Sequence, residues 1–461
     1  ATLRNRCPKH AALIGWAYGF GLWFVGAFWL YTSIHVYGDT NSALSVLLIA
    51  LMAITMGLFT AVQTWVYRRF FPETPLTFAP LWVFFEWAKT WVFTGFPWLF
   101  AGYAFTERFL DNYAPLFGIF GVSFVVIILA CALVEVIQKR VFWIIPSAIL
   151  LIGAFAASFI QFVTPKNEMA LSVSLVQGNI PQDRKWLAEY QVKTLEIYTD
   201  LTSKEWGRDL IVWPESSIPM PQTEIQPFLN SMAYQAKNMN SAWVTGIIYI
   251  DPKTSQQENR LMYYNSIMAS GHEAEGLYKK QRLVPFGEYI PFEGMLDILP
   301  NLAGSQDIMS YSRGSDDQSP LRVRGHNLGA AVCYEVAYPD TTRKNAINTD
   351  FLLTISNDAW FGSSAGPLQH LQMVQMRALE NGRWFMRATN TGVTAIIDHK
   401  GHIVKRAPQF ERTVLRGNVQ ARVGNTPYMR AGNYPILIII ALLLLLSYLG
   451  KRATPQRRLV K

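Results

Sequence analysis

The sequence predicts a bundle of membrane-spanning helices attached to a separate α/β domain. Of its 461 residues, 51% are hydrophobic and only 16% are charged, whereas about a quarter of the residues of an ordinary soluble protein carry a charge. Apolar stretches near the ~20 residues needed to cross a bilayer gather at the two ends of the chain. Between them, short apolar runs alternate with helical patterns, as in a layered α/β domain.

Six apolar stretches are candidate spans, and the basic residues beside them indicate their orientation. The stretches lie at residues 11–34, 43–67, 78–96, 113–137, 142–163 and 434–450. The neighbouring clusters of lysine and arginine all fall on the cytoplasmic side if the chain starts there. We therefore predict five spans over 1–163, a domain outside the cytoplasm over 164–433, and a last span with a cytoplasmic tail over 434–461. In a bacterium the outer domain lies in the periplasm.

The N-terminus qualifies this topology. The chain begins with Ala1 rather than methionine, and no signal peptide precedes the first stretch. We expect upstream spans to be missing, and an even number of them would leave the orientation unchanged.

Two ionisable residues interrupt the third stretch. Glu86 and Lys89 are three positions apart and can meet on one helix face. Because ionisable groups are costly in hydrocarbon, they form either a structural ion pair facing other helices or part of a substrate path.

The net charge of +9 does not predict nucleic-acid binding, because no basic run interleaved with aromatic residues occurs in the polar domain. The positive residues lie beside the apolar stretches, which is typical of membrane topology. The sequence also has no metal-ligand cluster and no phosphate-binding glycine loop. We expect no metal, no other cofactor and no nucleic-acid partner.

The outer domain contains runs typical of strands and periodic segments typical of helices. The predicted strands cover residues 170–177, 209–213, 242–249, 265–269, 350–356 and 394–398, and residues 328–335 are predicted to be a strand that runs into a turn. The predicted helices cover residues 184–204, 223–239 and 367–383. Residues 300–320 are rich in serine and glycine, and we predict a mobile lid there because long loops are often functional.

Cys333 is the only cysteine between the two apolar blocks, and it ends a predicted strand. A lone thiol outside the cytoplasm has no intramolecular disulfide partner, so it is either buried and inert or a nucleophile. A nucleophilic thiol needs a base to take its proton and a positive charge to stabilise the oxyanion. Glu215, just after another strand, and Lys280 can supply these.

Each of these residues also has an ordinary structural explanation. Buried cysteines are common, a glutamate after a strand often caps a helix, and Lys280 beside Lys279 can belong to a solvated basic face. Only the combination of Glu215, Lys280 and Cys333, with the motifs around them, favours an enzyme.

Those motifs resemble the nitrilase superfamily and, more closely, the apolipoprotein N-acyltransferase family, over nearly the whole chain. They are Leu175-Val-Gln-Gly-Asn-Ile-Pro181, Trp213-Pro-Glu-Ser216, Leu283-Val-Pro-Phe-Gly-Glu288, Cys333-Tyr-Glu335, Thr354-Ile-Ser-Asn-Asp-Ala-Trp-Phe361 and Thr94-Gly-Phe-Pro-Trp98. The resemblance implies a nitrilase-like αββα sandwich for the outer domain. The family usually has two further N-terminal spans, in line with a truncated start.

The resemblance also implies roles for single residues. It makes Glu215 the general base, Lys280 the oxyanion stabiliser and Cys333 the nucleophile. The residues that it places in support of the site are Glu288, Tyr334 and Glu335, and the residues alone do not separate the duties of the two glutamates. It places Trp186 on a flexible arm near the entrance.

The implied reaction is a two-step acyl transfer in the bacterial inner membrane. Cys333 takes an acyl chain from a phospholipid, and the α-amino group of the diacylglyceryl-cysteine of an apolipoprotein then attacks the thioester. Both substrates are lipids, so we expect the substrate cavity around Cys333 to open sideways to the bilayer. The opening should lie between the third apolar stretch, at residues 78–96, and residues 283–287. Two alternatives remain: a membrane-tethered amidase that releases its acyl group to water, and a transporter, which gives the three residues no role.

Overall fold

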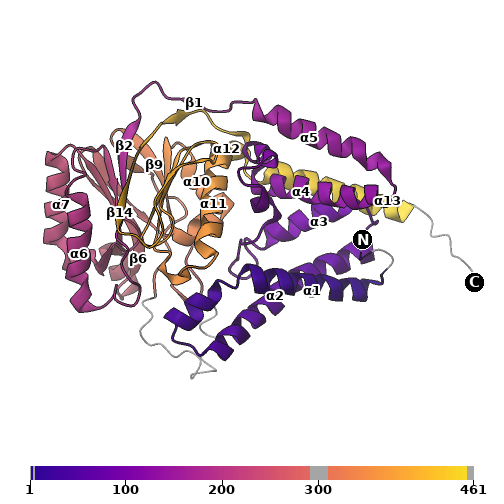
Figure 1. The fold of residues 1–461 in the computed structure, drawn as a ribbon, viewed down its shortest axis with the longest axis horizontal. Helices are drawn as coiled ribbons and strands as arrows, with labels where there is room; N and C mark the ends of the chain where they lie inside the picture. Colours follow the sequence, from indigo (N-terminus) through magenta and orange to yellow (C-terminus); the bar gives the residue numbers. More distant parts are fainter. Residues whose placement is uncertain (1, 4–5, 291–309, 454–461) are drawn as a thin grey trace, which may run out of the picture. The chain divides into compact units, whose positions relative to one another are not determined.

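The protein folds into two compact units in a computed structural model that describes residues 2–3, 6–290 and 310–453 (Figure 1). One unit is Val163–Asn425, and the other combines Ala1–Phe162 with Thr426–Lys461. Strands β1 (Thr164–Pro165) and β15 (Arg422–Val423) pair antiparallel where the chain enters and leaves the first of these units.

Long apolar helices make up the helical unit. They are α1 (Pro8–Gly26), α2 (Ser42–Phe70), α3 (Pro75–Ala88), α4 (Ala114–Ile137), α5 (Ile144–Ser158) and α13 (Tyr434–Ala453), with the short α12 (Pro427–Ala431) before the last. Among the described residues, four helical segments are long and apolar enough to cross a membrane: Ser42–Phe70, Phe109–Ile137, Val141–Ser158 and Tyr434–Ala453. They expose many large aliphatic side chains, as expected of helices that contact lipid.

The prediction of a span over 78–96 is wrong about its extent. Helix α3 has 14 residues and ends at Ala88, so at 1.5 Å per residue it is about 21 Å long, shorter than a ~30 Å hydrocarbon core. The chain then turns, with positive φ angles at Phe93 and Gly95. The first predicted span is also shorter, because α1 ends at Gly26 and turns precede a π-helical segment at Thr32–Tyr37. The hydrophobicity of the sequence alone does not predict these turns.

Glu86 and Lys89 are both buried in the helical unit. The Glu86 carboxylate accepts hydrogen bonds from Trp82 Nε1 at 2.8 Å and from the backbone N–H of Ala101 at 2.7 Å. Lys89 Nζ lies 5.3 Å from the ring centroid of Trp23. Each charged group therefore has partners within this unit, which favours the structural alternative over a substrate path.

The α/β unit contains two facing halves of one hydrogen-bonded sheet. The first half is β2 (Leu171–Gln177), β3 (Leu210–Val212), β4 (Ile218–Pro221), β5 (Ala242–Ile250), β6 (Tyr263–Gly271), β7 (Ala274–Lys279) and β14 (Thr413–Val419). The second half is β8 (Leu321–Val323), β9 (His326–Val332), β10 (Phe351–Ser356), β11 (Phe385–Thr389), β12 (Ala395–Ile397) and β13 (Ile403–Arg406). The halves join where β7 pairs with β8.

Helices cover both outer faces of the folded sheet (Figure 1). Helices α6 (Ala188–Thr202) and α7 (Gln226–Asn238) lie on the first half, and α10 (Pro339–Ala346) and α11 (Gly366–Asn381) lie on the second. A short helix, α8 (Pro252–Glu258), follows β5. The layers are helix, sheet, sheet and helix, so the predicted αββα sandwich is confirmed.

The main core lies between the two sheet halves. Alternate side chains of the first half, such as Val173 and Val212, join one buried cluster with side chains of the second, such as Val332 and Leu353. The opposite face of the first half buries Trp213 against α6 and α7. Strands β2, β3 and β5 run parallel, as do β9, β10 and β11. Two of the predicted catalytic residues, Glu215 and Cys333, follow the carboxyl ends of β3 and β9.

All of the predicted strands and helices of this unit occur. Four of the strands that were not predicted lack a continuous apolar run: β7, β13 and β14 have several exposed or half-buried residues, and β11 buries Arg387 at its centre. The other unpredicted strands, β1, β4, β8 and β15, have only two to four residues each. Of the predicted lid, residues 300–309 lie outside the described residues. Residues 310–320 contain neither helix nor strand, and the lid stays a prediction.

Candidate active site

The predicted catalytic residues follow strands of both sheet halves. Glu215 comes shortly after β3, Lys280 directly after β7, and Cys333 directly after β9. Because β3 and β7 belong to one half and β9 to the other, the site is assembled only when the two halves face each other.

Cys333 begins a tight turn at the end of β9. Its φ angle is 51°, a left-handed conformation that is uncommon outside glycine and is often found at functional sites. The backbone carbonyl oxygen of Cys333 accepts a hydrogen bond from His370 Nε2 at 3.0 Å. The thiol is half-buried, and its Sγ lies 3.3 Å from Ser356 Oγ.

Lys280 is an almost fully buried cation, with 1% of its side chain exposed. Its Nζ lies 2.9 Å from Glu288 Oε1 and 3.5 Å from Glu215 Oε1. Burial acts to lower the pKa of Lys280, but the carboxylates of Glu288 and Glu215 oppose it and hold this pKa above the usual range for lysine. The side chain is therefore a fixed positive charge, as an oxyanion stabiliser requires.

The Glu215 carboxylate is held at both oxygens. Asn265 Nδ2 donates to its Oε1 at 2.8 Å and to Glu288 Oε1 at 2.9 Å. The backbone N–H of Asn357 donates to Glu215 Oε2 at 2.8 Å. These contacts fix the direction of the carboxylate, which a general base needs if it is to meet a particular proton.

A glycine on the neighbouring strand makes room for this base. A Cβ atom on Gly246 of β5 would lie 2.5 Å from the carbonyl oxygen of Pro214 and 2.8 Å from the Cα of Glu215. Both are backbone atoms, which cannot rotate away. The segment that carries Glu215 can therefore lie this close to β5 only because residue 246 has no side chain.

The surroundings of Cys333 keep its thiol protonated at neutral pH. Burial raises the pKa of Cys333, the carboxylate of Glu215 raises it further, and the ammonium of Lys280 lowers it only in part. A thiol with a raised pKa is a poor nucleophile until a base removes its proton. The site therefore needs the base that Glu215 can provide.

Comparisons with known proteins identify the family of this chain. Residues 172–428 match the carbon-nitrogen hydrolase family, and residues 1–132 match the N-terminal domain of apolipoprotein N-acyltransferase. An apolipoprotein N-acyltransferase of Vibrio parahaemolyticus is 40% identical over 97% of this chain and 90% of its own length. The chain belongs to the apolipoprotein N-acyltransferase family.

A second relative agrees with this assignment. An apolipoprotein N-acyltransferase of Pseudomonas syringae pv. tomato is 39% identical over 96% of this chain and 88% of its own length. One similar solved structure is a nitrilase-superfamily member from Saccharomyces cerevisiae, 16% identical, with a TM-score of 0.40 over 65% of this chain and 99% of that one. The family models and the two apolipoprotein N-acyltransferases confirm, at the level of the family, the resemblance stated from the motifs.

The structure separates the contacts of the two supporting glutamates in this family member. Glu288 touches Lys280 directly and also accepts from the backbone N–H of Val284 at 2.8 Å. Glu335 is fully buried and accepts from the backbone N–H groups of Gln281 at 2.5 Å and Val332 at 2.6 Å. Glu335 therefore links Gln281, the residue after Lys280, to Val332, the residue before Cys333, through hydrogen bonds.

The Glu335 carboxyl also has an unusual protonation equilibrium. Burial raises its pKa to about 7, although hydrogen bonds from Val332, Gln281 and Arg282 and the charge of Lys280 act in the opposite direction. Tyr278 adds its hydroxyl, 3.1 Å from both carboxylate oxygens.

The other two predicted residues lie at the margins of this cluster. The ring of Tyr334 is buried and packs edge-on against Tyr338, with ring centroids 5.3 Å apart. Trp186 is 42% exposed. Its predicted role on a flexible arm stays a prediction.

Lys185, next to Trp186, was not predicted from the sequence. Only 1% of it is exposed, and its Nζ donates to the backbone carbonyl of Glu215 at 3.0 Å and to Asn357 Oδ1 at 3.2 Å. Burial lowers the pKa of Lys185 to about 8, against the opposing effect of Glu215 and Cys333. A lysine in a polar loop normally indicates a solvated surface, so the sequence alone gave no signal of this contact.

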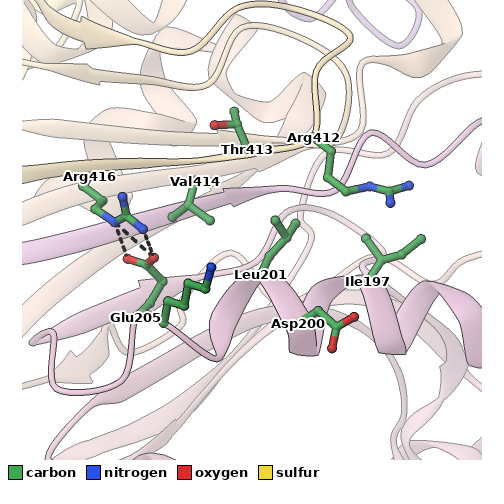
Figure 2. Close-up of a pocket in the computed structure, with 9 residues that line it drawn as sticks. Ile197, Asp200, Leu201, Glu205, Arg412, Thr413, Val414 and Arg416 are labelled. Atoms are coloured by element: carbon green, nitrogen blue, oxygen red, sulfur yellow. Dashed lines mark hydrogen bonds and ion pairs between the residues drawn. The ribbon is translucent and has the colours of Figure 1, made fainter.

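A hollow elsewhere on the α/β unit is separate from these residues. It has a volume of about 330 Å³ and lies between α6 and β14, and Figure 2 shows Arg416 paired with Glu205 at its edge. No residue assigned above to the catalytic cluster lines it.

Gly246→Ala is expected to destabilise the α/β unit, because the added Cβ must displace the Pro214–Glu215 backbone. Overpacking of this kind costs about 1–3 kcal/mol, and the midpoint of thermal unfolding of the detergent-purified protein measures it. Gly21→Ala serves as the control, because a Cβ at Gly21 of α1 meets open space. Equal midpoints for the two variants would contradict the proposed close approach.

Proposed function

We propose that this chain is an apolipoprotein N-acyltransferase that works through a thioester on Cys333. The observation that carries the proposal is the buried Lys280 ammonium between two carboxylates, with a protonated thiol in the same electrostatic cluster. Family membership adds the substrate class, and the apolar helices at both ends of the chain fit a reaction between lipids.

The first half of the reaction forms the thioester. Glu215 takes the proton from the Cys333 thiol, and the thiolate attacks an ester carbonyl of the phospholipid. The oxygen becomes negatively charged in the tetrahedral intermediate, where the Lys280 ammonium can stabilise it. When the intermediate collapses, the ester C–O bond breaks, Glu215 returns its proton to the leaving oxygen, and a lysophospholipid departs.

The second half transfers the acyl chain to nitrogen. The α-amino group of the diacylglyceryl-cysteine attacks the thioester carbonyl, and Glu215 takes a proton from the attacking nitrogen. The C–S bond breaks, and the leaving thiolate regains a proton from Glu215. An amide forms and Cys333 returns to its starting state, so the reaction is divided into two easier steps.

We place the reaction at the inner membrane of a bacterium, with the α/β unit in the periplasm. The support is the apolar helices among the described residues and the basic residues beside the predicted spans. The acyl donor is a membrane phospholipid, and the acceptor is the lipid-modified N-terminus of an apolipoprotein.

An acyl-transfer assay tests the proposal. Detergent-purified protein is incubated with acyl-labelled phospholipid and a diacylated lipopeptide with a free N-terminus. We expect the label first on the protein and then on the peptide amine. Release of the label as free fatty acid would instead indicate an amidase, and absence of label from the protein would favour a transporter.

Cys333→Ala is expected to abolish labelling of the protein by the acyl donor, because Cys333 carries the only thiol in the sequence of the α/β unit. Cys333→Ser should retain at most a trace, since a hydroxyl is much harder to deprotonate. Cys131→Ala, in helix α4, removes a thiol outside the site and is expected to label normally. Full labelling of the Cys333→Ala variant would exclude the assigned nucleophile.

Glu215→Gln is expected to slow thioester formation by roughly 10²–10⁴-fold, the usual contribution of a general base. Lys280→Ala is expected to lose roughly 10²–10³-fold, as for a missing oxyanion donor. Lys279→Ala is the matched control, because the neighbouring Lys279 pairs with Asp251 rather than with the catalytic carboxylates. The rate of single-turnover acylation is measured for all three variants. A wild-type rate for Glu215→Gln or Lys280→Ala would contradict the role proposed for the replaced residue.

A further inference from the structure

Ser356, the last residue of β10, has a hydroxyl between the nucleophile and a buried carboxylate. Its Oγ lies 3.3 Å from Cys333 Sγ and is hydrogen-bonded to Asp358 Oδ1. A serine hydroxyl carries one proton but can accept two hydrogen bonds. The hydroxyl cannot donate to both neighbours at once, so in one of the two contacts it must be the hydrogen-bond acceptor.

The state of Asp358 decides that direction. Its carboxylate is fully buried and ion-paired with Arg387, and His370 Nδ1 lies 3.1 Å from its Oδ1. Burial would raise the pKa of Asp358, but Arg387 and His370 outweigh it and hold this pKa below the usual range for aspartate. An ionised carboxylate only accepts hydrogen bonds, so Ser356 donates to Asp358 while Cys333 is a thiol and accepts the S–H of Cys333.

We propose that Ser356 is a further catalytic residue of the acyl transfer, whose hydroxyl turns from Asp358 to the sulfur when Cys333 loses its proton. This inference rests on the proposed function. The Cys333 proton goes to Glu215, and Ser356 keeps its own proton and only rotates about its Cβ–Oγ bond. A neutral donor thus meets the thiolate without adding a charge to the site.

The rotation is possible because Asp358 keeps other partners. Its Oδ2 remains paired with Arg387 and its Oδ1 remains next to His370 after the hydroxyl leaves. His370 also donates to the backbone carbonyl of Cys333, so the same group holds the carboxylate and the turn that carries the nucleophile. Asp358, His370 and Arg387 are positioning residues, and only Ser356 touches the reacting sulfur.

Several charged groups act on this sulfur from different elements. Glu215 after β3 and Asp358 after β10 oppose the thiolate, whereas Lys280 after β7 favours it. Lys185, before α6, also interacts with Cys333 electrostatically. The Ser356 hydrogen bond therefore stabilises the thiolate, whereas the Asp358 charge destabilises it. A purely structural role of Ser356 would not predict opposite effects when the two residues are replaced.

Alkylation of Cys333 by iodoacetamide as a function of pH tests this without any lipid, so the result does not depend on acyl transfer. Mass spectrometry of the Cys333 peptide gives the rate, and the exposed Cys7 of the same sample is the internal reference. A hydrogen bond to a charged group is worth at least one pKa unit. The midpoint of the curve of alkylation rate against pH reports the ionisation of the thiol. Cys333 of the Ser356→Ala variant should therefore be alkylated about ten-fold more slowly at pH values below this midpoint, and the midpoint should move to higher pH. Ser356→Thr should restore the rate.

Thr354→Val is the matched control. Thr354 is buried on the same strand, two residues earlier, and its hydroxyl has no hydrogen-bond partner among the described residues. Asp358→Asn should act in the opposite direction to Ser356→Ala and lower the midpoint, because it removes a negative charge. The proposal is overturned if Ser356→Ala alkylates like Thr354→Val, or if Ser356→Ala and Asp358→Asn both slow alkylation. If Ser356→Ala does not fold, a midpoint for Asp358→Asn at or above that of the wild type also overturns it.

Discussion

The pairing of the Lys280 ammonium with Glu215 and Glu288 is the interaction on which the rest of the site depends. A buried ammonium costs several kcal/mol unless it is paired and its neighbours are satisfied. The two carboxylates meet that need, and Asn265 donates to both of them. Because Lys280 and Glu215 follow different strands, their pairing also fixes where these strand ends lie. One interaction thus positions both the residue that we propose as general base and the charge that we propose for the oxyanion.

In the mechanism proposed above, this pairing couples proton removal by Glu215 to oxyanion stabilisation by Lys280. While Glu215 is ionised, it shares the charge of Lys280 with Glu288. Once Glu215 has taken the thiol proton, it no longer neutralises Lys280, and more of the positive charge is available to the oxyanion that forms next. Proton transfer and oxyanion stabilisation therefore follow one another in the order that the reaction needs. Removal of Lys280 would also leave two carboxylates together without their cation, so its loss affects the base as well.

The sequence was sufficient for the parts of the structure that repeat a local pattern. Strands with continuous apolar runs, such as β2 and β10, were predicted, and the motifs placed Glu215, Lys280 and Cys333 at strand ends. It was insufficient where a polar residue is buried by a partner far along the chain. Asn265 and Lys185 have ordinary polar neighbours in the sequence, and only the strand pairing and helix packing of the first sheet half bring them to Glu215. Strand β11 was missed for the same reason, because its buried Arg387 is explained by Asp358.

In the proposed mechanism, the charge state of the site after thioester formation suits an amine acceptor. Formation of the thioester removes the ionisable thiol of Cys333, so the sulfur can no longer become negative until the acyl chain leaves. Glu215 is then an ionised base again beside a neutral thioester. An α-amino group has a pKa of about 7.7–8.0 and is largely protonated at neutral pH, so it must lose a proton before it can attack. A carboxylate next to the thioester attracts this ammonium, whereas a neutral water molecule gains no such attraction. The ammonium gives its first proton to solvent, so that Glu215 stays free to take the second proton from the attacking nitrogen. Together with exclusion of water from the thioester, this difference favours transfer to nitrogen over hydrolysis.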